Sequence, residues 1–342
     1  MVWATKLAPV HLSPFWASGD LVYEGRRTAF SHTKEVIMRG IPSRPPIVDC
    51  VILALLLLGS ALIASGAEPP PSFEVEVHGA GSPVLLIPGL SCSGEVWDQT
   101  VKALEERHEV HVLSLAGFAG RAPIEAPFLP RVRDDIVAYI QAQQLNRPAI
   151  VGHSLGGFLA FWLAASEPTL VGPIVAVDGV PFLPALMDAS ATVDSIHTMA
   201  TNMKAMMASL TPEQFSAQNR MSLTRMVTAS EDVERLARQG AASDRATVAQ
   251  AMFELMTTDL RNGLSSIESP VLLIVAGAAT PTPKGRTRLL RSYEAQIAPI
   301  PDHRVVLAGD ARHFIMLDSP DFFHATLTSF LADTTGSKRA AQ

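Results

Sequence analysis

The sequence predicts an α/β fold: a mostly parallel sheet with helices on both faces and a helical cap inserted between two strands. From residue 73 to about 179, short apolar runs typical of strands alternate with segments of helical periodicity. The alternation stops over residues 180–265, where no strand-like run occurs, and resumes at residue 271. Repeated strand–helix units imply a parallel sheet whose helices cover both faces. The interruption therefore predicts an insertion next to that sheet.

Each predicted element depends on its own local pattern. Residues 73–78 alternate apolar and polar side chains, as a half-exposed strand does, whereas 84–87 are continuously apolar, as in a strand buried on both faces. Residues 94–107 carry an apolar stripe at helical spacing, and 158–165 form a helix of small and apolar residues. Further strands are expected at 110–115, 149–151, 174–177, 271–275 and 305–307, and further helices at 131–144, 288–297 and 320–331, with a loose polar tail after Thr334.

The predicted cap, residues 180–265, separates two core segments, 73–179 and 266–334. Pro184 and Pro212 divide it into several helices. Ligands of open α/β sheets bind at the carboxyl ends of the strands, so a cap at that edge would cover a ligand. Methionine adapts to irregular apolar space, so the methionines of this segment indicate either a plain helical core or an apolar lid: Met187, Met199, Met203, Met206, Met207, Met221, Met226, Met252 and Met256.

The N-terminal region has the pattern of a targeting segment. Residues 1–37 show no clear period and are expected to be a start-site artefact or a disordered leader, with translation starting at Met38. Residues 38–67 combine two arginines, an apolar run and small residues before Glu68, which is the pattern of a signal peptide. An uncleaved membrane anchor is the alternative, although the run is shorter than the about 20 residues that span a bilayer. The protein is therefore expected to be exported, either periplasmic or secreted, and to contact a membrane only if this segment is retained.

Composition argues against several classes of function. The formal net charge is -6 and no run of Lys and Arg stands out, so no nucleic-acid partner is expected. The two cysteines, Cys50 and Cys92, cannot form a disulfide framework, and no cysteine–histidine spacing indicates a zinc site. Cys92 is expected to be a small apolar residue near a loop. Neither a metal nor a cofactor is expected, and the oligomeric state stays open.

The strongest motif is Gly152-His153-Ser154-Leu155-Gly156, between the strand predicted at 149–151 and the helix at 158–165. A sharp strand-to-helix turn lifts the serine hydroxyl clear of the sheet, and it requires nearly absent side chains two positions before and after the serine. Both positions are glycine. The following helix directs its positive end toward a developing oxyanion. The motif predicts a nucleophile elbow with Ser154 as nucleophile, and the side chain of His153 is expected to point away.

This motif and the order of elements make residues 73–332 resemble the α/β-hydrolase superfamily, in particular its capped, esterase-like members with a serine nucleophile. The resemblance implies an oxyanion hole built from two backbone N–H groups. One would come from Leu90, in the loop Pro88-Gly89-Leu90-Ser91, and the other from Leu155. Many members have His-Gly where this chain has Pro-Gly, a departure that backbone donors tolerate.

The resemblance also implies a general base in a loop after the last strand, and His313 occupies that place. Serine needs such a base because it is a poor nucleophile at its free pKa. The acid that orients the histidine usually follows the strand before the last, in a Gly-x-x-Asp turn, but Thr280 stands in that slot. Asp178 is the predicted acid, since some members place theirs after this earlier strand. A loop-entry cap is the other interpretation of Asp178, and Asp310 is a weaker alternative acid.

These residues predict a serine hydrolase, similar to carboxylesterases and lipases, that cleaves a carboxylic ester through an acyl-enzyme. The expected substrate is a small ester with a largely apolar acyl or alcohol part. The same constellation serves amidases, thioesterases and carbon–carbon bond hydrolases, and a peroxidase-like activity is also compatible with it. A ligand-binding protein on a hydrolase scaffold, with little turnover, is the alternative from another class, and Thr280 at the usual acid position motivates it.

Overall fold

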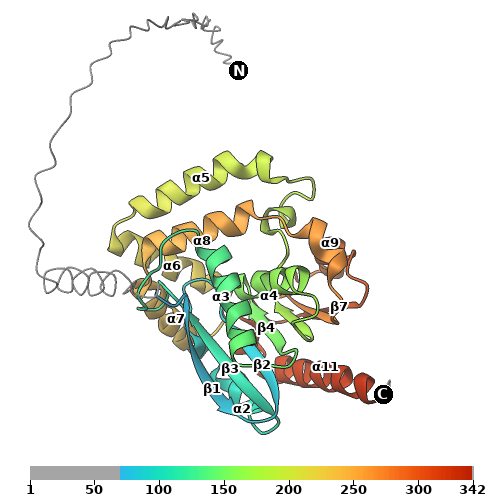
Figure 1. The fold of residues 1–342 in the computed structure, drawn as a ribbon. Coiled ribbons are helices and arrows are strands. Elements are labelled where there is room, and N and C mark those ends of the chain that lie inside the picture. Colours follow the sequence, from blue (N-terminus) through green and yellow to red (C-terminus); the bar gives the residue numbers. More distant parts are fainter. Residues whose placement is uncertain (1–69, 341–342) are drawn as a thin grey trace, which may run out of the picture. The chain divides into compact units, whose positions relative to one another are not determined.

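The computed structural model describes residues 70–340, so the predictions for residues 1–67 lie outside the described range. Within that range seven strands form one sheet in the order β1-β3-β2-β4-β5-β6-β7 (Figure 1). β1 pairs antiparallel with β3, and all other neighbours pair in parallel. This confirms the mostly parallel sheet. The strands are β1 (Phe73–Gly79), β2 (Ser82–Ile87), β3 (His108–Leu115), β4 (Ala149–His153), β5 (Ile174–Val177), β6 (Val271–Ala276) and β7 (His303–Ala308).

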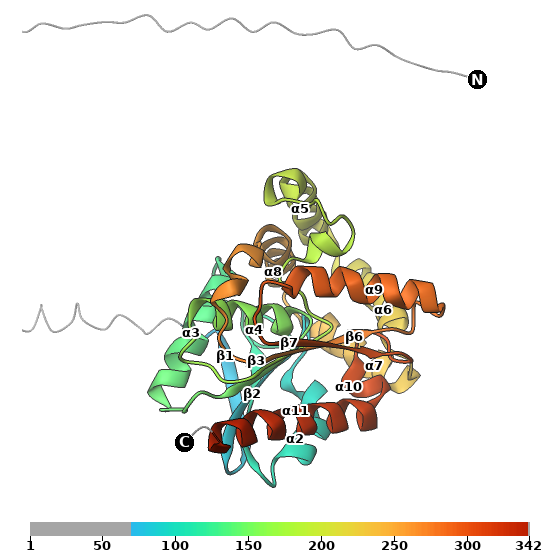
Figure 2. The same cartoon turned by 90° about the vertical axis from the view of Figure 1, so that its right-hand side faces the viewer.

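Helices cover both faces of the sheet, as Figure 2 shows. One face carries α3, α4 and α9, and the other carries α2, α10 and α11. Parallel strands buried in this way need helical crossovers, which explains the strand–helix alternation of the sequence. The bounds are η1 (Gly94–Trp97), α2 (Asp98–Leu104), α3 (Phe128–Ala142), α4 (Leu155–Ser166), α9 (Pro283–Ile297), α10 (Ile315–Asp318) and α11 (Pro320–Ala340).

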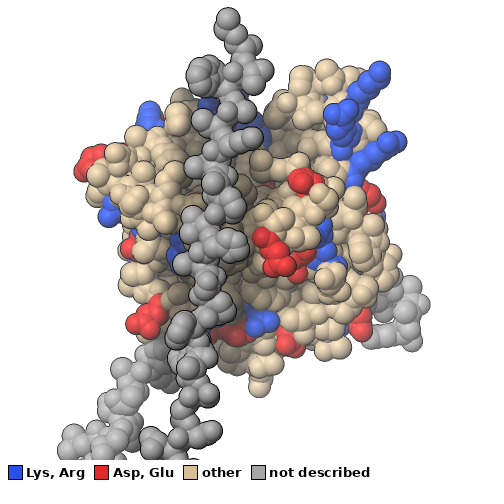
Figure 3. All heavy atoms as spheres, turned by 90° about the horizontal axis from the view of Figure 1, so that it is seen from above, with Lys and Arg blue, Asp and Glu red and all other residues tan. Residues whose placement is uncertain are grey.

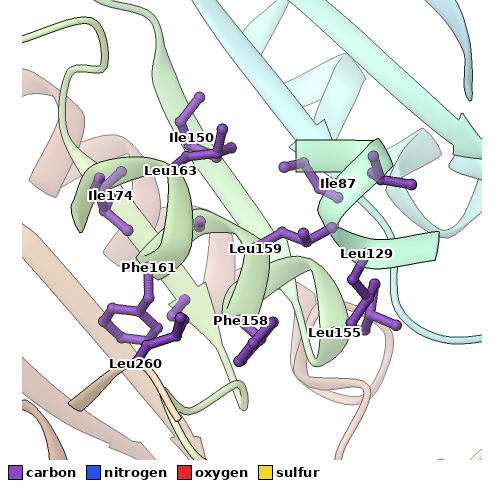
Figure 4. Close-up of a cluster of buried hydrophobic side chains, with 14 of the residues drawn as sticks. Ile87, Leu129, Ile150, Leu155, Phe158, Leu159, Phe161, Leu163, Ile174 and Leu260 are labelled. Carbon is purple, nitrogen blue, oxygen red and sulfur yellow. The ribbon is translucent and has the colours of Figure 1, made fainter. Parts of the chain in front are cut away.

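Each face of the sheet has its own apolar layer. Ile150 of β4 belongs to the layer with α3 and α4, whereas its neighbour Val151 belongs to the opposite layer. Successive side chains of a strand point to opposite faces, so one continuously apolar strand serves both layers. Figure 4 shows the first layer, where Leu159 and other side chains of α4 lie against β2, β4 and α3. This packing fixes α4 on the sheet, and α4 begins directly after Ser154.

The C-terminal tail differs from the prediction. A loose chain is expected after Thr334, but α11 continues to Ala340. No proline interrupts residues 321–340, and Lys338, Arg339 and Ala340 are good helix formers, so the single Gly336 does not end this helix. Among residues 70–340 no helix is both long enough and apolar enough to cross a membrane.

The chain between β5 and β6 contains helices and irregular segments but no strand. It comprises η2 (Leu183–Leu186), α5 (Val193–Ser209), α6 (Pro212–Met226), α7 (Ser230–Ala242), α8 (Arg245–Thr257) and η3 (Arg261–Ser266). In Figure 1 α5 and α8 lie beyond the sheet at one end. The buried carboxylate of Glu254 on α8 accepts hydrogen bonds from the N–H groups of Phe128, 2.9 Å, and Leu129, 2.6 Å. These bonds satisfy the free N–H groups at the start of α3 and join the inserted helices to the core. The cap boundaries at 180 and 265 remain a prediction.

Candidate active site

Ser154 lies at the turn between β4 and α4. Its φ of 54° falls in the left-handed region, which residues with a side chain seldom adopt. Its N–H donates a hydrogen bond of 2.8 Å to the carbonyl oxygen of Val177 on β5. A Cβ on Gly152 would lie 2.0 Å from the carbonyl oxygen of Gly156, and a Cβ on Gly156 would lie 2.2 Å from that of Ile87. Backbone contacts therefore require both glycines, and the serine occupies a strained strand-to-helix turn.

His313 and Asp178 meet, although they lie 135 positions apart in the sequence. Asp178 follows β5, and His313 lies between β7 and α10. The Nδ1 atom of His313 is 2.7 Å from Oδ2 of Asp178. An ionised carboxylate only accepts hydrogen bonds, so Nδ1 carries the proton and Nε2 is the basic nitrogen. The structure thus brings the predicted base and the predicted acid into direct contact.

The carboxyl group of Asp178 has hydrogen-bond donors on both of its oxygens. Besides His313, the N–H of Ala276 lies 3.0 Å and the hydroxyl of Tyr293 lies 3.2 Å from Oδ1. Burial raises the pKa of Asp178, but the hydrogen bond and charge of His313 and the Ala276 N–H lower it further, so the pKa lies below its ordinary value. Burial and the charge of Asp178 in turn raise the pKa of Tyr293. Asp178 is therefore an anion at neutral pH, and Tyr293 is a donor.

Ser154, His313 and Asp178 all line one cavity of about 440 Å³. Most of the wall is apolar and comes from the inserted helices. Of the described residues that line the cavity, Asp178 is the only aspartate, and none is a glutamate, lysine or arginine. The methionines of the inserted segment differ in position. Met203, Met207 and Met252 line the cavity, whereas Met187 does not and is 90% exposed. Figure 3 shows the molecule from above, and most of the visible surface of residues 70–340 there is formed by residues other than Asp, Glu, Lys and Arg.

The loop after β2 lies against the start of α4. Leu90 lines the cavity beside Ser154, and Leu155 is the first residue of α4. A Cβ on Gly89 in this loop would lie 3.4 Å from Cβ of Ser154, which shows how closely the loop approaches the elbow. A helix N-terminus carries a partial positive charge that favours an anion. The two predicted oxyanion donors are thus close to the serine, and their role stays a prediction.

His153 does not point away from the site as expected. It is buried, lines the cavity, and its ring centroid lies 4.6 Å from that of His313. Its Nε2 lies 3.1 Å from the carbonyl oxygen of His313, so Nε2–H is the donor. Burial and the charge of His313 hold the pKa of His153 well below its ordinary value, so its ring is neutral. His153 is the last residue of β4, and its side chain lies against the loop of His313.

The alternative residues lie elsewhere. Thr280 follows β6 outside the cavity lining, and its carbonyl oxygen accepts a hydrogen bond from Arg286. The side chain of Asp310 is 99% exposed, 3.7 Å from Arg286, so it does not support His313. Cys92 does line the cavity, but burial raises the pKa of its thiol to about 12, which leaves it protonated and a poor nucleophile. No group of three or more His, Cys, Asp and Glu among the described residues could hold a metal ion.

The loop that carries His313 is bonded to the C-terminal end of α6. Arg312 donates from Nη1 to the carbonyl oxygens of Thr224, 2.8 Å, and Val227, 3.0 Å. The carboxylate of Asp318 accepts from the N–H of Arg312, 2.8 Å, and from Thr228. Sequence reasoning missed these contacts and that of Tyr293, because no local motif marks them and all but the bond between Arg312 and Asp318 join residues far apart in the sequence.

Comparison with known proteins gives esterases and other hydrolases. The sequence matches a pimeloyl-(acyl-carrier protein) methyl ester esterase of Nitrosomonas europaea with 27% identity over 260 residues, 74% of this chain and 96% of the relative. The structure is similar to the enol-lactonase from Burkholderia xenovorans, with a TM-score of 0.60, 18% identity and coverage of 76% of this chain and 96% of that one. It is also similar to a thermophilic esterase from Thermogutta terrifontis, with a TM-score of 0.57, 18% identity and coverage of 77% and 93%.

Residues 84–326 match the sequence model of the Alpha/beta hydrolase family. This range begins in β2, includes the elbow and His313, and ends within α11. The match covers well over half of the chain and agrees with the sheet order, the turn at Ser154 and the similar solved structures. The chain belongs to the alpha/beta hydrolase family.

Proposed function

We propose that this protein hydrolyses small, uncharged carboxylic esters through an acyl-enzyme on Ser154. The observation that carries the proposal is the 2.7 Å contact between His313 Nδ1 and Asp178 in a cavity that Ser154 also lines. The pair leaves Nε2 of His313 free to accept the serine proton. The names of relatives, a methyl ester esterase, an enol-lactonase and a thermophilic esterase, support an ester as substrate.

The reaction has two acyl transfers. Ser154 Oγ attacks the ester carbonyl carbon while Nε2 of His313 takes its proton, and the carbonyl oxygen becomes an anion bound by the N–H groups of Leu90 and Leu155. Collapse of this intermediate breaks the bond to the alcohol, which leaves with the proton from His313. Water then attacks the acyl-enzyme while Nε2 of His313 takes one of its protons; the bond from the acyl carbon to Ser154 Oγ breaks, Oγ receives that proton, and the carboxylic acid is released. Asp178 fixes the imidazole tautomer and stabilises its charged form.

The cavity supports an apolar substrate. Its volume, about 440 Å³, is in the range of small-molecule sites, and its wall is mostly Met, Leu, Phe and Val side chains. Burial of an apolar chain against this wall stabilises binding by about 0.8 kcal/mol for each methylene group. No cofactor enters the reaction as written, since serine, histidine and water supply each proton and each bond.

A fluorophosphonate probe tests the proposal. Wild-type protein should be labelled rapidly on Ser154, and Ser154→Ala should not be labelled, while Ser265→Ala, which changes an exposed serine outside the cavity, should behave as wild type. A panel of p-nitrophenyl esters should then give turnover that rises with acyl length until the cavity is filled. Absence of labelling at high probe concentration would favour a ligand-binding protein. Labelling with turnover of amides, thioesters or carbon–carbon bonds but not of esters would select those alternatives.

A further inference from the structure

Ser91 has an unusual backbone conformation in the loop between β2 and η1. The N–H of Cys92 donates to the carbonyl oxygen of Gly89, 3.3 Å, and so closes a β-turn. Ser91 is the third residue of that turn, and its φ of 61° falls in the left-handed region. Glycine usually takes this position, because a side chain there is strained. A serine held in this conformation beside a candidate nucleophile is a candidate for function rather than for stability.

The hydroxyl of Ser91 is unpaired and open to the cavity. Ser91 is 8% exposed and lines the cavity together with Ser154. Among residues 70–340 its hydroxyl has no hydrogen-bond partner, yet it is not one of the unpaired polar atoms there that are fully enclosed. Oγ of Ser91 therefore keeps some exposed area, and the cavity is the space that it meets. The hydroxyl of Ser93 in the same loop, in contrast, accepts a hydrogen bond from Gln239, 2.9 Å.

The position of Ser91 in the chain places this hydroxyl near the nucleophile. The turn begins at Gly89, where a Cβ would lie 3.4 Å from Cβ of Ser154. The residue between Gly89 and Ser91 is Leu90, whose N–H is assigned above to the oxyanion. A hydroxyl on the next residue, open to the same cavity, is a further donor on the same side of Ser154. An O–H that donates to a negatively charged oxygen forms a short, strong hydrogen bond.

We propose that Ser91 is a further catalytic residue, whose hydroxyl donates a third hydrogen bond to the oxyanion of the tetrahedral intermediate. This inference rests on the proposed function and adds to its mechanism. No bond to Ser91 forms or breaks, because its proton stays on Oγ and stabilises the charge as a preorganised dipole. The hydrogen bond strengthens as negative charge develops on the carbonyl oxygen, so its loss lowers kcat and leaves KM nearly unchanged. The strained turn holds the hydroxyl in place before the substrate binds.

Ser91→Gly separates this role from a structural one, because it removes the hydroxyl and relieves the positive φ together. The melting temperature should stay equal or rise, since glycine adopts this conformation without strain. For a short p-nitrophenyl ester, kcat should fall by about 10²-fold, the lower end of the loss for one oxyanion donor, with KM nearly unchanged. Ser91→Ala, which keeps a side chain in the turn but lacks the O–H, should show the same loss of kcat.

Ala119→Gly is the matched control. Ala119 also has a positive φ, 49°, but it does not line the cavity, so relief of its strain should leave kcat as in wild type. A purely structural Ser91 predicts a lower melting temperature in its variants and an unchanged kcat per titrated active site. That result, or near-wild-type kcat in both Ser91→Gly and Ser91→Ala, would overturn the proposal.

A pair of ketones tests the contact with the oxyanion itself. An alkyl trifluoromethyl ketone adds to Ser154 as a hemiketal whose oxygen is negatively charged, whereas the corresponding methyl ketone binds as a neutral carbonyl. In Ser91→Gly the dissociation constant of the trifluoromethyl ketone, followed by fluorine NMR, should rise by about the factor by which kcat falls. The methyl ketone should bind wild type and Ser91→Gly equally. Equal changes for both ketones would contradict a donor that acts on the oxyanion.

The same ketones separate failure of this inference from failure of the proposed function. If wild type hydrolyses no ester, yet its hemiketal on Ser154 is weaker in Ser91→Gly, ester hydrolysis is wrong and the donor role of Ser91 stands. If wild type hydrolyses esters and Ser91→Gly matches it in kcat and in both dissociation constants, the donor role is wrong and the hydrolase assignment stands. If wild type neither hydrolyses esters nor forms the hemiketal, both are wrong.

Discussion

At Asp178, burial and hydrogen bonding act on the carboxyl group in opposite directions. The side chain is 10% exposed, which disfavours the charged form, but donors from His313, Ala276 and Tyr293 compensate. Three donors around one buried carboxylate are more than a loop-entry cap needs. The arrangement fits a residue whose charge must persist beside an imidazole.

Asp178→Asn should therefore keep the shape of the site and lose most of its turnover. The amide would favour the wrong tautomer of His313, and the comparable change in a serine protease lowers kcat by about 10⁴-fold. The measurement is kcat per titrated active site, taken beside the melting temperature. Asp310→Asn is the matched control, because Asp310 lies in the same loop region as His313 but is exposed. Near-normal turnover in folded Asp178→Asn would remove Asp178 from the mechanism.

His153 predicts a pH dependence of stability. Its pKa is well below 6.5 in the folded protein, whereas the unfolded chain has the ordinary value of about 6.5. Below that pH the unfolded state binds one more proton, so the free energy of unfolding is undiminished above about pH 6.5 and falls as pH decreases.

His153→Gln should flatten this decline by up to about 1.4 kcal/mol per pH unit, the slope of one proton. Denaturant unfolding between pH 7 and 4.5 measures it, and His78→Gln, at a partly exposed histidine near the sheet edge, is the control. Equal slopes for wild type and His153→Gln would show that His153 does not titrate as described.

A local motif predicted Ser154, and the resemblance to the α/β-hydrolase superfamily led to His313 and Asp178 through their places after predicted strands. No such signature exists for Tyr293, which reaches Asp178 from α9, or for the contact of His153 with His313. These are contacts through space between segments that the sequence does not link. The catalytic roles of Ser154 and Asp178 are tested by the labelling and turnover measurements described above.

Among the elements, α6 and the loop of His313 form a connected unit. Residues of α6 line the cavity, and its last turn accepts hydrogen bonds from Arg312 and, through the Met226 carbonyl, from the N–H of Phe314 at 3.1 Å. The two residues that flank His313 are thus both attached to α6. A shift of this helix would move His313 relative to Ser154.

Arg312→Ala should lower kcat by about tenfold, because small misplacement of a catalytic group is costly. Its fluorophosphonate labelling should slow in parallel, while the melting temperature and KM for a short ester change little. Arg225→Ala, which removes an exposed cation from the same end of α6, should match wild type. A loss of kcat in both variants, or in neither, would contradict the positioning role of Arg312.

Element positions were more predictable than element ends. The apolar runs at 84–87 and 271–275 lie inside β2 and β6, since strands buried on both faces need unbroken apolar sequence. The helix expected at 288–297 begins earlier, at Pro283, where Thr282 caps it through the N–H of Gly285. The first and last residues of a helix depend on single capping side chains of this kind, and the periodicity of the sequence does not reveal them.

For the whole molecule, the order of strands and helices was enough to predict the sheet and its two helical layers. The arrangement of α5 to α8 was not predictable, because amphipathic helices can pack in several ways and long-range contacts select one. The bonds of Glu254 to α3 are an example: two elements over a hundred positions apart meet at one carboxylate.

The N-terminal region leads to a prediction about the mature chain. The basic, apolar and small-residue pattern at 38–67 predicts export and cleavage before Glu68. Intact-mass measurement of protein exported by a bacterial host should therefore give a chain that begins near Glu68. A chain that begins at Met1 or Met38 would contradict cleavage, and a requirement for detergent would favour a membrane anchor.

The most direct test of the central claim is capture of the acyl-enzyme. Wild-type protein mixed with a p-nitrophenyl ester and quenched in acid within milliseconds should release one p-nitrophenol per site in a burst and carry the acyl mass on the peptide that contains Ser154. Ser154→Ala should give neither, with turnover reduced by about 10⁶-fold. Ester hydrolysis that continues in Ser154→Ala above about a thousandth of wild type, or an acyl group found on another residue, would contradict the account.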